Sequence, residues 1–155
     1  MTDKSAFSAE EWHALTDAPL LVTMAIFAAG EHGPISMIKE ASASARAIAN
    51  PGDRGVANDL IAQIAADAES KEARHDMKEH RGKDLDAAIA GALADLEPAA
   101  DALRRNTSHM EATEVAGWLL DIAQAVAKSA KTVNPKEQET IEKITAIFQA
   151  TPASA

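Results

Sequence analysis

Cysteine is absent from this sequence, and its absence removes several classes of chemistry at once. Without thiols the chain can form no disulfide, no thiolate zinc site and no iron–sulfur cluster. A cysteine nucleophile is excluded for the same reason. The candidate metal ligands considered below are therefore carboxylates and imidazoles.

Aromatic residues and long apolar runs are also scarce. Aromatics make up 3% of the chain and tyrosine is absent, whereas 36 of the 155 residues are alanine. Alanine has the highest helix propensity and lets helices approach closely, so the composition favours an all-α bundle, and no segment is convincing as a strand. The longest apolar run, residues 19–29, is about half as long as a membrane helix. We expect a buried core helix there and no membrane insertion.

Basic residues are fewer than acidic ones, with 15 Lys and Arg against 24 Asp and Glu, which gives a formal net charge of −9. This balance argues against nucleic acid and anionic membrane surfaces as partners.

Residues 1–7 lack the basic segment and apolar core of a signal peptide, so we expect a cytoplasmic protein. The length suits one helical domain over residues 1–155.

Helix start and stop signals predict a compact bundle of about seven helices. Ser8 and Glu11 have the spacing of a capping box, and Pro19 suits the first turn of a second helix. Pro98 should kink or interrupt the fifth helix. The predicted helices start near Ser8, Pro19, Pro34, Val56, Leu85, His109 and Pro135.

Apolar residues at helical spacing indicate which faces are buried. In the third helix these positions are Ile35, Ile38, Ala41, Ala45 and Ile48. In the sixth and seventh helices they are Val115, Leu119, Ile122 and Val126, and Ile141, Ile144 and Phe148. Trp12 and Trp118 are expected in the core. Alternate alanines of the third helix sample more than one face and predict a seam for self-association: Ala41, Ala43, Ala45, Ala47 and Ala49.

Residues 69–83 differ from the rest, because they contain eleven ionisable side chains and a single large apolar one. We expect an exposed helical extension or connection there, and a frayed tail at residues 151–155. On a continuous helix one stripe of this segment would carry four oxygen and imidazole ligands suited to a divalent metal: Glu72, His75, Asp76 and Glu79. The neighbouring lysines and arginines favour the plainer interpretation of a solvated face with weak ion pairs.

A second Glu-x-x-His pair, Glu10 and His13, completes a pattern seen in di-iron carboxylate bundles. Those bundles project their ligands from the middle of helices into a dry centre. Glu10 instead belongs to a first turn, where the capping box and the helix dipole explain acidic residues. A ferritin-like metal site is therefore the alternative interpretation.

Two similar helical hairpins are predicted over residues 22–40 and 119–141. In each, an apolar helix ends in small residues and a polar turn leads to a helix that opens with proline. Residues 119–137, LLDIAQAVAKSAKTVNPKE, and residues 28–36, AAGEHGPIS, resemble the turn repeat of the TerB-like helical family of tellurite-resistance proteins. The resemblance implies the fold and a role in stress response. It implies no metal site, because His32 replaces the family's turn aspartate and Ala130-Lys131 replace the later Asp-Gly.

The turn formed by Glu31 and His32 is a second candidate binding site, since its histidine could be a ligand or a pH-sensitive contact. Dinucleotide, phosphate, nucleophile-elbow, zincin and calcium-loop motifs are all missing from the sequence. We therefore predict a non-enzymatic helical binding or interaction module without a required cofactor, whose partner is a protein or a second copy. The alternatives are a metal-binding carboxylate protein and a carrier of a small apolar ligand.

Overall fold

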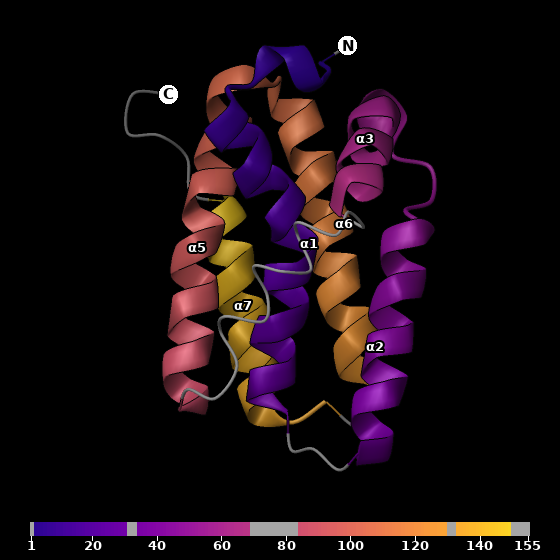
Figure 1. The fold of residues 1–155 in the computed structure, drawn as a ribbon, viewed down its shortest axis with the longest axis vertical. Helices are drawn as coiled ribbons and strands as arrows, with labels where there is room; N and C mark the ends of the chain where they lie inside the picture. Colours follow the sequence, from indigo (N-terminus) through magenta and orange to yellow (C-terminus); the bar gives the residue numbers. More distant parts are fainter. Residues whose placement is uncertain (1, 31–33, 69–83, 130–132, 150–155) are drawn as a thin grey trace.

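A computed structural model describes residues 2–30, 34–68, 84–129 and 133–149, with the backbone alone for residues 34–37. This part of the chain is all-α, as predicted, and contains no strand. Two 3₁₀ turns, η1 (Lys4–Ala6) and η2 (Gly55–Ala57), accompany the helices. The α-helices of the described residues, labelled in Figure 1, are α1 (Ala9–Ala29), α2 (Pro34–Ala49), α3 (Asn58–Ala68), α5 (Leu85–Asn106), α6 (His109–Ser129) and α7 (Pro135–Gln149).

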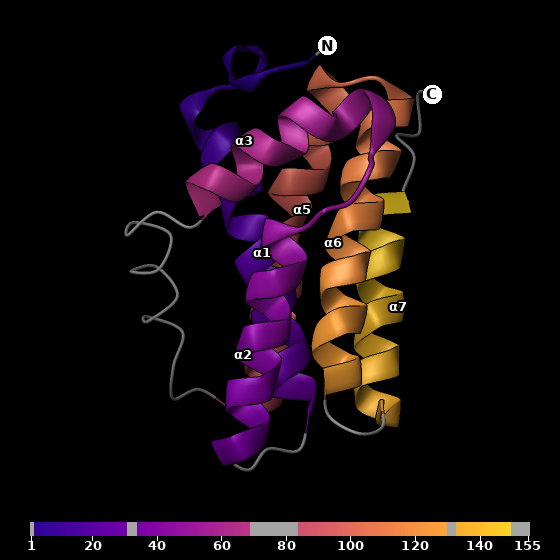
Figure 2. The ribbon, with the colours of Figure 1, turned by 90° about the vertical axis from the view of Figure 1, so that its right-hand side faces the viewer.

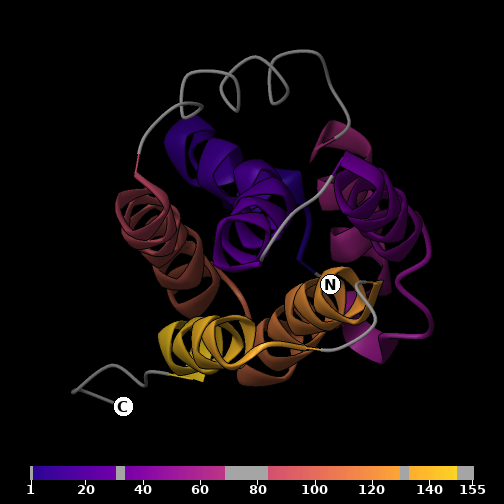
Figure 3. The same cartoon turned by 90° about the horizontal axis from the view of Figure 1, so that it is seen from below.

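The central helix is α1, which contacts α5 most extensively and also packs against α6, α3 and α7. Seen from below, α5 and α2 lie on opposite sides of α1, while α6 and α7 close a third side (Figure 3). The short helix α3 crosses above α2 (Figure 2). Large side chains from α1, α3, α5, α6 and α7 fill the centre and are at most 1% exposed, among them Leu15, Ile26, Leu60, Leu96, Trp118 and Ile144. Burial of these side chains supplies the main driving force for the fold.

The first two predicted helices are one helix, so the described residues contain six α-helices where about seven helices were expected. Pro19 lies inside α1, although proline cannot donate a helical hydrogen bond and its ring crowds the preceding turn. Leu15, Val22 and Ile26 on either side of it are at most 1% exposed. The apolar contacts on both sides thus hold α1 continuous. Pro98 likewise lies inside α5. The sequence predicted that this proline would kink or interrupt the helix, but the helix continues to residue 106.

The predicted hairpins are present as the consecutive pairs α1–α2 and α6–α7, but they pack differently. α7 contacts α6, its neighbour in the chain, whereas α2 touches α1 only slightly and lies mainly along α6. The two turn regions meet at their edges, because Asn134 Nδ2 donates to the Ala29 carbonyl oxygen at 3.3 Å. The hairpins are therefore similar in element order and different in tertiary contacts.

By length and composition alone, α1 is apolar enough to cross a membrane. In the fold, 61% of its most apolar window is buried inside the protein. The core helix of a water-soluble protein has these same properties, so the finding does not establish insertion. The expected absence of membrane insertion stays a prediction.

Candidate interaction surface

Most of the ligands predicted from sequence fall outside the described residues. This holds for the metal candidates Glu72, His75, Asp76 and Glu79, and also for the turn candidates Glu31 and His32. Both proposals therefore stay predictions.

Glu10 and His13 lie in the described part of α1 and point to local roles. Glu10 is exposed in the first turn. His13 Nε2 lies 3.2 Å from Asp17 Oδ2, one turn further along the same helix. Elsewhere in residues 2–30, 34–68, 84–129 and 133–149, no three His, Asp or Glu side chains come together as a metal site would require. The neighbouring Glu11 forms the predicted capping box with Ser8.

Buried carboxylates were not predicted from the sequence, yet Glu40, Glu111 and Glu137 are each at most 5% exposed. Glu111 forms a capping box with Ser108 at the start of α6 and also accepts hydrogen bonds from Thr2, whose N and Oγ1 lie 2.9 and 2.7 Å from its oxygens. Burial on its own raises the pKa of Glu111, but the hydrogen bonds from Thr2 and Ser108 outweigh burial and lower it to about 2. This carboxylate joins the N-terminus to the start of α6.

Glu137 has a comparable role at the start of α7. Its Oε1 accepts from the Asn134 backbone N at 3.2 Å, while its own N donates to Asn134 Oδ1 at 2.8 Å. This reciprocal cap lies at the helix start predicted near Pro135. Glu111 and Glu137 thus serve to begin helices and are not free to act as catalytic acids or bases.

The inward face of α2 is unexpectedly polar. It buries Glu40, Ser44 and Ile48, which are four residues apart and so share one face. The Ser44 and Thr23 hydroxyl oxygens are 2.7 Å apart, and Thr23 Oγ1 also donates to the Pro19 carbonyl oxygen at 2.9 Å. These contacts join α2 to the centre of α1.

The C-terminal end of α2 is attached to α6 by a tryptophan. Trp118 Nε1 donates to the Ala47 carbonyl oxygen at 3.2 Å. In a regular helix that oxygen would accept from the N–H four residues later, but residue 51 is proline and has none. Trp118 supplies the missing donor and thereby sets which side of α2 faces α6.

The outward face of α2 contradicts the stripe predicted for this helix. Ile38 is 69% exposed, and Ala41 and Ala45 are exposed too; of the predicted stripe only Ile48 is buried, while the Ile35 side chain lies outside the described residues. The Thr23 and Trp118 contacts hold the opposite side of α2 toward the bundle. The exposed residues form a continuous surface, called here the α2 outer face: Ile38, Lys39, Ala41, Ser42, Ala45, Arg46 and Ala49.

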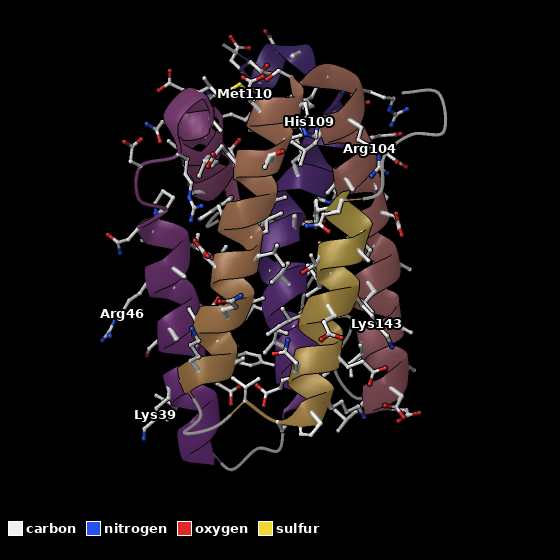
Figure 4. The ribbon with its side chains drawn as sticks, turned by 180° about the vertical axis from the view of Figure 1, so that it is seen from behind. Lys39, Arg46, Arg104, His109, Met110 and Lys143 are labelled. Carbon is white, nitrogen blue, oxygen red and sulfur yellow. The ribbon has the colours of Figure 1, made fainter. Side chains whose placement is uncertain are left out.

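The α2 outer face is positively charged, although the protein carries a net charge of −9. Glu40, the one acidic residue of α2, is buried on the opposite side. Lys39 and Arg46 point away from the bundle, as Figure 4 shows, and no ion pair joins either to another residue that the structure describes. Two helical turns, roughly 10 Å, separate them along the helix. The face therefore combines one large apolar side chain, a flat surface of small residues and two available cations.

Comparisons with protein-family models, with curated proteins and with solved structures give no match for this chain.

Proposed function

We propose that this protein is a non-enzymatic helical interaction module that binds a partner protein through the α2 outer face. The observation that carries the proposal is the inverted polarity of α2, which buries Glu40 and Ser44 while leaving Ile38, Ala41 and Ala45 in water. Local preference and tertiary structure usually agree, and places where they disagree are often functional.

Ile38 would provide most of the apolar contact. Single exposed apolar residues are common on protein surfaces and need no explanation. Ile38 differs because it continues into a surface of exposed alanines on a helix that buries Glu40 and Ser44. Full burial of such a side chain is worth about 1.5–3 kcal/mol, enough to change a dissociation constant by one to two orders of magnitude.

The flat alanine surface suits a second helix, since small side chains let two helix axes approach closely. Lys39 and Arg46 would favour a partner with acidic residues along its edge and would disfavour a basic one. The α2 outer face thus fits an acidic amphipathic helix, which is one of the common ways in which proteins recognise helical segments.

Site-specific photo-crosslinking in the cells that make this protein tests the proposal. A photo-reactive residue at Ala45 should give a protein adduct, and the same residue at exposed Glu142 on α7 should not. Adding Ile38→Asp and Arg46→Glu to the Ala45 variant should abolish the adduct, with the thermal melting temperature kept. An equal yield at both positions, or no adduct at Ala45, would refute the proposal.

A TerB-like architecture and a role in stress response remain part of this proposal. The two hairpins, whose turn regions are linked by the hydrogen bond from Asn134 to the Ala29 carbonyl oxygen, support this architecture. The stress role rests on the sequence resemblance alone. The metal-binding and apolar-carrier alternatives stay predictions, because no contact among the described residues favours either one.

A further inference from the structure

The outward side of α5 has a surface that complements the α2 outer face. Small residues line it at helical spacing: Ala87, Ala90, Gly91, Ala94 and Pro98. All are exposed except Gly91, which is partly exposed. A methyl group added at Gly91 would meet no atom of the described residues within 4 Å, so their packing does not require glycine there. Glycine in a helix costs stability relative to alanine, and a close external contact would account for it.

The charge of α5 is opposite to that of α2. From residue 84 to residue 101 the chain carries five acidic residues and no basic one: Asp84, Asp86, Asp95, Glu97 and Asp101. Asp86 already binds Lys136 at 2.5 Å, and Asp101 pairs with Arg104. Asp84 and Glu97 are exposed and form no ion pair with another described residue, and Asp84 also caps α5 by accepting from Asp86 N at 3.3 Å. They are the carboxylates available to an incoming cation.

α2 and α5 lie on opposite sides of the bundle in two perpendicular views (Figures 1 and 3). Within one chain the two surfaces face away from each other and cannot meet. A contact between them must therefore join the α2 outer face of one molecule to α5 of another, in a head-to-tail arrangement.

From this complementarity we infer that the occupant of the α2 outer face is the outward side of α5 in a second copy of this chain, an inference that rests on the proposed function. Ile38 packs over the gap at Gly91, where no atom of the described residues lies within 4 Å of an added methyl group. Arg46, eight residues from Ile38, then lies beside Asp84 if the helices are antiparallel, or beside Glu97 if they are parallel. Either orientation pairs a cation with a carboxylate.

Analytical ultracentrifugation of the purified protein from micromolar to millimolar concentration tests this inference. The mass should rise with concentration and fall with added salt, which screens the charge pairs. Arg46→Glu, which reverses one cation, and Gly91→Gln, which fills the gap, should each weaken association by at least about tenfold. Gly91→Gln should also raise the melting temperature, because glutamine is the better helix former and the space is open.

Mixing the two variants gives the decisive result. Each variant retains one intact surface, so an equimolar mixture should form a heterodimer at concentrations where neither variant associates alone. Thr113→Gln, at an exposed position on α6, is the control and should associate like the unmodified protein. Failure of the mixture to form a dimer, or unchanged association of Gly91→Gln, overturns the inference.

The crosslinking experiment separates this inference from the proposed function. An adduct at Ala45 with twice the mass of the chain supports both. An adduct with a different protein, together with a purified chain that stays monomeric, overturns the second copy as occupant and leaves the interaction module in place. A monomeric chain with no adduct at Ala45 overturns both.

Discussion

The two hairpins, α1–α2 and α6–α7, share one pattern in the sequence but pack differently in the structure. Both second helices open with proline and carry apolar residues at helical spacing. In α7 that spacing correctly predicts the buried side, since Ile141 and Ile144 are 6% and 0% exposed. In α2 it fails, and Ile38 is left in water. The difference teaches that apolar spacing within one helix does not by itself decide which side is buried, because contacts with other helices also orient it.

The largest expected effect contrasts the isoleucines of the two second helices. Ile144→Ala removes a fully buried side chain from α7 and should lower the free energy of unfolding by about 2–5 kcal/mol. Ile38→Ala on α2 should change it by less than about 0.5 kcal/mol, because that side chain is exposed. Urea unfolding at a protein concentration low enough to prevent association measures both. Equal losses would mean that α2 is oriented as its sequence pattern predicted.

The capping boxes of the first helices, α1 and α6, give the next effect. The pKa of Glu111 falls from 4.5 to about 2, so its stabilisation is complete above pH 4.5 and is lost as the pH falls toward 2. Full loss amounts to about 3 kcal/mol, at 1.36 kcal/mol per pKa unit. Glu111→Gln should remove this acid-dependent part of the stability. Glu11→Gln, which alters the more exposed capping box, should remove less, and urea titrations across this pH range compare the two.

Trp118→Phe should release the end of α2 while leaving α7 in place. The variant loses the hydrogen bond to the Ala47 carbonyl oxygen, together with some packing, at a cost of about 1–2 kcal/mol. Hydrogen exchange should accelerate at the amides of residues 44–50 more than at those of α7. Uniform acceleration across both helices would show instead that Trp118 acts only through the general core.

The smallest expected effect concerns the hydroxyl pair between α1 and α2. A double-mutant cycle with Thr23→Val and Ser44→Ala should give a coupling energy of about 0.5–1 kcal/mol, because the two oxygens are 2.7 Å apart and buried. Strictly additive losses of stability would show that this pair does not help to orient α2. The same cycle with Thr23→Val and Thr140→Val on α7 is the control and should be additive.

Helix starts were the most predictable part of the fold, since Ser8, Ser108 and Asn134 act on groups within a few residues of themselves. The buried faces of α6 and α7 were predictable too, because large apolar residues dominate them. The continuity of α1 and α5 was not, since helix propensity alone favours a break or kink at Pro19 and Pro98. Of the candidate surface, the sequence offered only the alanine seam in α2, of which Ala41, Ala45 and Ala49 are exposed.

By itself the sequence determined an all-α chain with capped helices, an alanine-rich interior and a net negative charge, because these depend on composition and on contacts within one helical turn. Tertiary structure alone decided that α1 continues past Pro19 and that α2 buries Glu40 and exposes Ile38. The orientation of α2 depends on Thr23 and Trp118, which are 21 and 71 residues away from their partners in α2. No local pattern contains such contacts, and they are what leaves a basic, apolar helix face available on an acidic protein.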